Sequence, residues 1–431
     1  MSNPNYPTEP PLPDVLADEL PIPVADGPNI GPAMMQKRMW VMYPLAAFAI
    51  SVVWGSILQQ LFARQIAGFA SNAVSAPILG AVVSVGAIVA IFAQPIVGRL
   101  SDRTRTRFLG RRNIWTLGTA VVSAIGLLLL PLAQDGIWLG VLWAVVIFPL
   151  NGYQIATTAT FPERVPVRSQ PSMSGIYGAV SLLGIFGGVA VGGLVHNLFL
   201  AYAIVAAQLL IVAVLFAIGT KDYVPVAAKP GKKASSPLPG FRDHRNYWWA
   251  LFARFVAFLA YTIATALHVY VLRDYIHIGS LEKASIAAVQ MSGVSTLAVL
   301  VAALVVGVLA SKTGRLKVFV IASTLIFIPG CVVALIAPTF TGMLVAYGIL
   351  GFGFGAYLAV DQALIAQVLP KAADAGRDLG IANIANAGPQ IFAPVLAGAL
   401  VAVAGYPPLW VIAIVLTIAA SVAILPIRGI R

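Results

Sequence analysis

The chain has 431 residues, of which 59% are hydrophobic and 10% are charged, and its formal net charge is +12. An average soluble domain is about 25% charged, so this composition excludes a water-soluble globular protein. In a soluble chain the basic balance would suggest nucleic acid. The positions of the charges, described below, instead exclude nucleic acid as a partner.

The first segment, residues 1–37, is predicted to be a disordered tail on the cytoplasmic side. Residues 1–36 hold five acidic residues, nine prolines and no Lys or Arg. A secretory signal peptide begins with a basic region, so this segment is not one. Its composition is typical of disorder.

Twelve long apolar stretches follow the tail, and each is predicted to be a transmembrane helix. A bilayer core about 30 Å thick needs roughly 20 apolar residues per helix, whereas strands of a membrane barrel are about 10 residues of alternating polarity. The fold class is therefore an all-α membrane protein. The predicted spans are 40–62, 75–98, 113–133, 136–160, 172–195, 198–219, 247–272, 284–309, 317–337, 340–366, 379–402 and 406–427.

The basic residues indicate the orientation of these spans. With a cytoplasmic N-terminus, 23 of the 27 Lys and Arg residues fall in cytoplasmic segments, six of them in 99–112. Three fall outside, and Arg254 lies within a span. This bias follows the positive-inside rule, which places both termini in the cytoplasm. The arginines are also expected to contact anionic lipid headgroups.

The chain is predicted to consist of two six-helix halves, 38–219 and 247–431, joined by a cytoplasmic linker at 220–246. GRLSDRT (98–104) is similar to GVLASKT (307–313), and NGYQIATTATFPERVP (151–166) is similar to GAYLAVDQALIAQVLP (355–370). Gly110 and Gly314, Tyr153 and Tyr357, and Pro166 and Pro370 are all 204 residues apart. Each half has an even number of spans, so the halves run parallel, as in one class of transporters.

Over about 38–430 the chain resembles the major facilitator superfamily, whose loop signature is carried by Gly98, Asp102, Arg103, Gly110, Arg111 and Arg112. The form SDRTRTRFLGRR resembles the sugar:cation symporter branch, which includes glycoside–pentoside–hexuronide and sucrose-transporter-like carriers. DQALIAQVLP followed by GRDLGIANIANAGPQ resembles actinobacterial members of that branch. The resemblance implies that the loop signature latches the two halves in the outward-open state. The alternative is that its arginines only orient the chain.

Two charges are predicted to lie inside the membrane. Asp361 lies nine residues before Pro370, which is roughly 13 Å from the helix end at 1.5 Å per residue. Arg254 lies at a similar depth in the seventh span. Intramembrane charges suggest function, so a pair that breaks when Asp361 is protonated could couple transport to a proton. The alternatives are a fixed salt bridge, or an Arg254 that reaches the cytoplasmic face.

Uncharged polar residues within the spans are predicted to line a central cavity, because an unsatisfied amide in hydrocarbon is costly. Asn383, Asn386 and Gln390 share one helix face, and Pro389 and Pro394 are expected to interrupt that helix. His268 is instead expected near the outer face. The alternative role of these uncharged polar residues is to join helices by hydrogen bonds. The other candidates are Gln59, Gln60, Asn151, Tyr153, Gln154, Thr157, Tyr261, Thr265 and Gln290.

These features predict a monomeric secondary transporter of the inner membrane that moves a small neutral polar solute, most simply a sugar or glycoside. The branch it resembles usually has carboxylates in the first half, and the second span has none, so sodium coupling is disfavoured. Proton coupling, facilitated diffusion and export of a drug or metabolite stay open, as does a sensor or scaffold without transport. No metal site, cofactor motif or catalytic constellation is found, and GIFGGVAVGG and GILGFGFGAY are read as helix packing, not phosphate loops.

Overall fold

The computed structural model describes residues 33–104, 109–165, 169–220, 241, 244–368 and 375–427. The tail up to 32 and most of the predicted linker, 221–240, lie outside the described residues. Within the helices a few side chains also lie outside the description, among them those of Asp102, Arg103, Arg111 and Asn383.

The described residues fold entirely into helices joined by short connections, with no strand among them. The first half comprises α1 (Ala33–Ser56), η2 (Ile57–Leu61), α2 (Phe62–Phe69), α3 (Asn72–Arg103), α4 (Arg111–Leu129), η3 (Leu130–Leu132), α5 (Gly136–Arg164), α6 (Gln170–Leu194) and α7 (Leu198–Gly219). The second half comprises α8 (Arg245–Thr265), α9 (His268–Tyr270), η5 (Val271–Tyr275), α10 (Leu281–Thr313), α11 (Leu316–Leu325), α12 (Phe327–Ile336), α13 (Phe340–Val368), α14 (Ala375–Ala404) and α15 (Pro407–Ile424).

Eleven helical stretches of the described chain are long and apolar enough to cross a membrane. The first combines α1, η2 and α2, and the seventh combines α8, α9 and η5. The predicted stretch 379–402 lies within α14, whose described apolar part is the shorter Gly388–Ala404. The chain is therefore a multi-pass membrane protein with the all-α fold expected from its composition.

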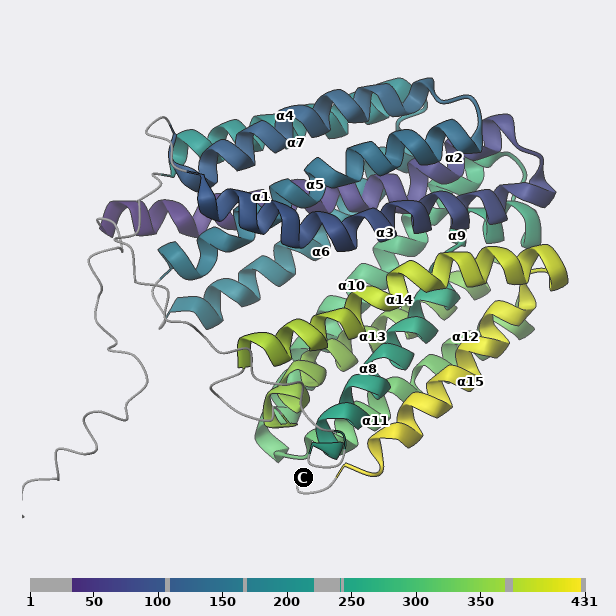
Figure 1. Cartoon of the computed structure of the whole chain (residues 1–431). Coiled ribbons are helices and arrows are strands. Elements are labelled where there is room, and N and C mark those ends of the chain that lie inside the picture. Colours follow the sequence, from purple (N-terminus) through teal and green to yellow (C-terminus); the bar gives the residue numbers. More distant parts are fainter. Residues whose placement is uncertain are drawn as a thin grey trace, which may run out of the picture.

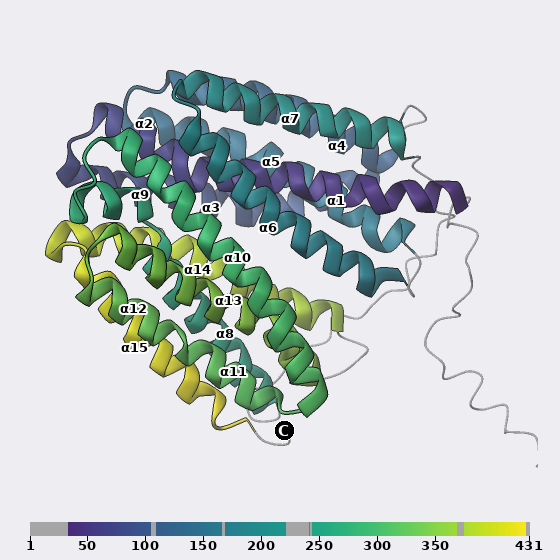
Figure 2. The same ribbon diagram turned by 180° about the vertical axis from the view of Figure 1, so that it is seen from behind.

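The helices form two bundles, α1–α7 and α8–α15, which lie one above the other in Figure 1. The bundles meet through α3 against α14 and through α6 against α10. They approach each other near α2 and α9 and diverge toward the end where α3 ends and α4 begins (Figures 1 and 2). We call this diverging end the arginine-rich end.

The internal repeat in the sequence has a structural counterpart in how each bundle fixes its last helix. Asn113 Nδ2 donates to the carbonyl of Thr220 at 2.6 Å, just after α7 ends. Lys317, 204 residues later, donates to the carbonyls of Leu425 and Ile427 at 2.7 and 2.8 Å, where α15 ends. Two side chains of different chemistry thus satisfy carbonyls that a helix end leaves without partners.

The two glycines at the repeated loops both have a positive φ, although their ψ angles differ. Gly110 has φ 83° and precedes α4, and Gly314 has φ 65° and ends α10. A residue with a Cβ is strained in this region, so glycine is the residue that fits both turns. This explains why the pair survives where the rest of the loop differs.

The glycine-rich runs lie where helices pack closely, as the sequence suggested. A Cβ on Gly188 of α6 would lie 2.2 Å from the backbone oxygen of Val52 on α1. A Cβ on Gly355 of α13 would lie equally close to the backbone oxygen of Val299 on α10. Small residues allow such contact where no hydrophobic effect drives helices together.

We expect Gly188→Leu to destabilise the first bundle by about 3 kcal/mol, because the clash is with backbone and not with a movable side chain. Gly178→Leu on the same helix is the matched control, since nothing lies within 4 Å of its Cβ position. Cys331, the one cysteine of the chain, is buried and reports unfolding when it reacts with a thiol dye on heating. Equal melting temperatures for the two variants would contradict the close-packing account.

Candidate substrate cavity and ion pair

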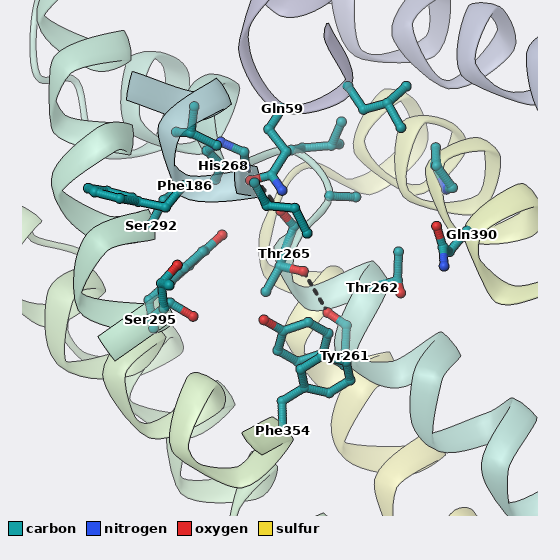
Figure 3. A pocket seen from close by; sticks show the side chains of 18 of the residues that line it. Gln59, Phe186, Tyr261, Thr262, Thr265, His268, Ser292, Ser295, Phe354 and Gln390 are labelled. Carbon is teal, nitrogen blue, oxygen red and sulfur yellow. Dashed lines mark hydrogen bonds between the residues drawn. The ribbon is translucent and has the colours of Figure 1, made fainter. Parts of the chain in front are cut away.

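A cavity of about 310 Å³ lies between the two bundles. The first bundle contributes residues of η2, α3 and α6 to its wall, and the second contributes residues of α8, α9, α10, α13 and α14. Figure 3 shows Gln59 and His268 toward one end of this space and Tyr261 with Phe354 toward the other. A site built from both bundles changes shape whenever the bundles move relative to each other.

One end of the cavity is an aromatic platform. Tyr261 and Phe354 stack with their ring centroids 3.9 Å apart and their planes within 4° of parallel. Phe258 meets Phe354 edge-on at 5.4 Å. Flat apolar faces of this kind suit a ring with its own apolar face.

The remaining wall mixes apolar side chains of α3, α6 and α10 with uncharged polar ones. The amide and hydroxyl residues in it are Gln59, Thr262, Thr265, Ser292, Ser295, Thr296 and Gln390. No Asp, Glu, Lys or Arg is found among the described residues that line it. The cavity therefore offers hydrogen bonds without a fixed charge, which favours a neutral ligand.

The structure brings Arg254 and Asp361 together as a buried ion pair. Arg254 Nη2 lies 2.9 Å from Asp361 Oδ2, and both side chains are almost fully buried. Tyr357 donates to Asp361 Oδ1 at 2.7 Å, and Arg254 Nε donates to Asn386 Oδ1 at 3.2 Å. Arg254, on α8, thus joins α13 to α14. Its buried side chain does not reach the cytoplasmic face, which was the alternative position for it.

The ion pair lies beyond the aromatic platform, toward the arginine-rich end. Arg254 precedes Phe258 by about one turn of α8, and Asp361 follows Tyr357 by about one turn of α13. Phe258 also meets Tyr357 edge-on at 5.9 Å. A continuous set of aromatic contacts therefore connects the cavity with the group that holds the carboxylate.

Polar contacts join the two bundles at the end opposite the arginine-rich end. Tyr270 donates to the carbonyl of Ala63 at 3.0 Å, and Arg273 Nη2 donates to Ser75 Oγ at 3.1 Å. Arg273 is itself paired with Asp274, whose carboxylate also accepts from Tyr406 at 2.9 Å.

An exposed contact between His196 Nε2 and the carboxylate of Glu282 joins the bundles near the same end. There α3 and α14 are also in backbone contact, since a Cβ on Gly80 would lie 2.5 Å from the carbonyl oxygen of Pro394. The cavity is therefore closed on this side, while the bundles diverge on the other (Figure 1).

Some of the residues predicted for the cavity line it, and others do not. Gln59, Tyr261, Thr265 and Gln390 are in its wall. Asn386 instead holds Arg254, and the side chain of Asn383 lies outside the described residues. The structure places the remaining candidates elsewhere, with Gln290 exposed on α10 and with Gln60, Asn151, Tyr153, Gln154 and Thr157 packed in the first bundle.

Three of those first-bundle residues make hydrogen bonds to nearby backbone. Asn151 donates to the carbonyl of Ile147, Thr157 to that of Tyr153, and Tyr153 to that of Ala46. Only the Tyr153 bond joins two helices, α5 and α1, as the alternative role requires, whereas the other two bonds stay within α5. Gln60 is fully buried in η2, and its amide has no partner among the described residues.

The structure contradicts one expectation about the helices. Pro389 and Pro394 lie inside α14, which continues through both. The irregular segments are the π-helices η2 and η5 in the first and seventh spans, and such π-segments are frequent at functional sites. His268 is buried in the cavity wall, beside the break between α8 and α9 that the sequence does not mark, and its expected depth near the outer face stays a prediction.

The residues of the predicted latch lie at the arginine-rich end. Gly98 is on α3 with open space around its Cβ position, and Gly110 starts α4. Arg112 is buried, and its guanidinium donates to Ser101 Oγ at 2.9 Å. The side chains of Asp102, Arg103 and Arg111 lie outside the described residues, so their role as a latch stays a prediction.

Comparison with known proteins supplies the family. The Major Facilitator Superfamily model matches residues 39–294 and 252–429. The chain belongs to the major facilitator superfamily. No curated protein matches it in sequence.

Solved structures of this superfamily share the fold. A mutant form of the nucleoside transporter NupG is 16% identical with a TM-score of 0.70, covering 91% of this chain and all of its own. A D-xylose-proton symporter is 14% identical with a TM-score of 0.69, covering 91% of this chain and 98% of its own. A bacterial homolog of the human lysosomal transporter Spinster, inward-facing and occupied, is 16% identical with a TM-score of 0.65, covering 92% and 96%. At these identities the likeness concerns the fold.

Proposed function

We propose that this member of the major facilitator superfamily is a secondary transporter of a small neutral polar solute, a sugar or glycoside. The observation that carries the proposal is the cavity between the bundles, which combines the stacked Tyr261–Phe354 platform with amides and hydroxyls and has no Asp, Glu, Lys or Arg among its described lining residues. A sugar presents hydroxyls at its edge and C–H groups on its faces, which matches both parts of the wall. The resemblance of the loop sequence to the sugar:cation symporter branch supports the same substrate class.

The proposed cycle is alternating access in the cytoplasmic membrane of a bacterium. The Lys and Arg distribution supports a cytoplasmic arginine-rich end. With that orientation the contacts of Tyr270, Arg273 and Gly80 close the outer side, and the described state faces inward. The opposite state requires these contacts to open while the bundles come together at the loop that carries the latch residues.

We also propose that the Arg254–Asp361 pair couples substrate movement to a proton. Protonation of Asp361 removes the charge that holds Arg254 and frees the link between α13 and α14. The aromatic contacts from Tyr261 through Phe354 and Phe258 to Tyr357 connect the substrate site with the ion pair, so a shift of these rings on substrate binding reaches Asp361.

The test uses purified protein in liposomes with an acid exterior and a panel of mono- and disaccharides. Substrate-dependent acidification of the interior is expected, and counterflow of a labelled sugar without acidification would mean facilitated diffusion. If neither occurs, the sugar assignment fails. Efflux of amphipathic compounds would then support export, and silence there too would support a sensor.

We expect Tyr261→Ala to weaken sugar binding about tenfold, because it removes one face of the aromatic platform. Phe199→Ala is the control, since this ring lies on the exposed surface of α7, far in sequence from the platform. Binding is followed by tryptophan fluorescence or calorimetry in detergent. Equal affinity in both variants would remove the platform from the site.

A further inference from the structure

One face of α8 and α9 presents hydrogen-bond acceptors to the cavity. Thr262 and Thr265 lie three residues apart on α8, so they share one side of that helix. His268 lies just past the break that ends α8, and all three residues line the cavity. Figure 3 shows Thr265 between the platform and His268. We call these three residues the acceptor face.

The two threonines have already used their hydroxyl hydrogens. Thr262 Oγ1 donates to the carbonyl of Phe258 at 2.8 Å, and Thr265 Oγ1 donates to the carbonyl of Tyr261 at 2.8 Å. Each hydroxyl has one hydrogen, so what remains for a ligand is the lone pairs of the oxygen.

The backbone partner of His268 fixes its tautomer, so that the other ring nitrogen is an acceptor. Nδ1 of His268 lies 3.2 Å from the carbonyl of Thr265. A carbonyl oxygen only accepts, so Nδ1 carries the hydrogen, and in the neutral ring Nε2 is then an acceptor. His268 is 4% exposed, and its Nε2 has no partner among the described residues. A buried acceptor of this kind is costly until something donates to it.

Across the cavity, the first bundle provides a residue that can form hydrogen bonds with the same ligand. Gln59 belongs to η2, which contacts α9, and its half-buried amide lines the cavity with His268. An amide both donates and accepts. A ligand group held by Gln59 and His268 would therefore bridge the two bundles at the closed end.

We propose that the acceptor face selects substrates with hydroxyl groups that donate toward α8 and α9, with His268 Nε2 accepting from one of them. This deepens the proposed function, on which it rests, by naming the hydrogen-bond polarity of the ligand. A solute that only accepts hydrogen bonds leaves the three acceptors without donors and is rejected. A polyol donates to all three, and its own oxygens accept from Gln59.

The matched variants are His268→Asn and His268→Gln. Asparagine keeps a donor near the δ position for the Thr265 carbonyl but has no acceptor at the ε position, whereas glutamine places an amide oxygen there. We expect His268→Asn to weaken binding of the transported sugar about tenfold and His268→Gln to stay within about twofold of the parent. Equal losses in the two variants would overturn the proposal.

A fluorinated series of the same sugar gives the second arm, because a C–F group cannot donate. One position of fluorination is expected to cost the parent about tenfold in affinity and to cost His268→Asn nothing further. The proposal fails if the ratio of the two affinities, parent to His268→Asn, is the same for every fluorinated sugar as for the unmodified sugar. It also fails if the parent transports a solute without O–H or N–H groups.

A third arm needs no substrate and separates this inference from the sugar assignment. The chain has four histidines, so nitrogen-15 histidine spectra are simple, and the signal lost in His268→Asn identifies the residue. We expect the neutral ring with hydrogen on Nδ1. A ring with hydrogen on Nε2 would overturn the acceptor face even if sugars are transported. The expected tautomer without transport of any sugar would overturn the proposed substrate alone.

Discussion

Asp361→Asn is expected to abolish accumulation of substrate against a gradient while downhill exchange continues. The change keeps the shape of the side chain and an oxygen for the Tyr357 hydroxyl, but it removes the charge 2.9 Å from Arg254. An amide cannot bind and release a proton, so the pair cannot be made and broken in each cycle. Accumulation is measured in liposomes under an imposed proton gradient, and exchange is measured by counterflow in the same vesicles.

Loss of stability is the competing explanation, and a double variant separates the two. Removing one partner of a buried ion pair typically costs about 3–5 kcal/mol, because the other charge is left buried. Arg254→Gln combined with Asp361→Asn leaves neither charge and should recover most of that stability without recovering accumulation. Accumulation at the parental level in either variant would exclude the pair from coupling and leave it as a structural salt bridge.

Gly80→Leu is expected to open the end of the cavity that is closed in this structure. A Cβ at this position would lie 2.5 Å from the carbonyl oxygen of Pro394, so a leucine cannot fit while α3 and α14 touch. The clash is with α14 of the other bundle, so separation of the bundles at this end would relieve it. A penalty of about 3 kcal/mol in the closed arrangement shifts the ratio of the two states roughly hundredfold toward the one open at this end.

The readout is a cysteine placed in the cavity wall. In a Cys331→Ala background, Gln59→Cys should react with a membrane-impermeant thiol reagent from the outer side at least tenfold faster when Gly80→Leu is present. Gly68→Leu is the control, because nothing lies within 4 Å of its Cβ position at the same end of the first bundle. Unchanged labelling of Gln59→Cys when Gly80→Leu is added would show that contact between α3 and α14 is not the outer closure.

The first and second halves show how far the repeat in the sequence predicts tertiary roles. Tyr202 and Tyr406 are 204 residues apart, and each donates to the end of the first span of its own half, at Gln65 and Asp274. The repeat therefore predicts the position of the tyrosine hydroxyl and its role as a donor. It does not predict the partner, because Gln65 is an amide and Asp274 is a carboxylate that is also paired with Arg273.

The sequence by itself determined the membrane class, the helical spans, the repeat and the family. These follow from backbone hydrogen bonding in lipid, which forces each long apolar run into a helix whatever its neighbours are. Counting Lys and Arg residues added a predicted orientation, which rests on the positive-inside rule. The intramembrane charges Asp361 and Arg254 stood out because such residues are rare, and the structure places them in contact.

Only the tertiary structure decided which polar side chains share a cavity. The spans are apolar all round, so no hydrophobic face indicates which side of a helix looks inward. Asn151 and Thr157 donate to carbonyls of their own helix, whereas His268 lines the cavity just past the break between α8 and α9. There α9 contacts η2 of the other bundle, and this contact exists only once both halves have packed.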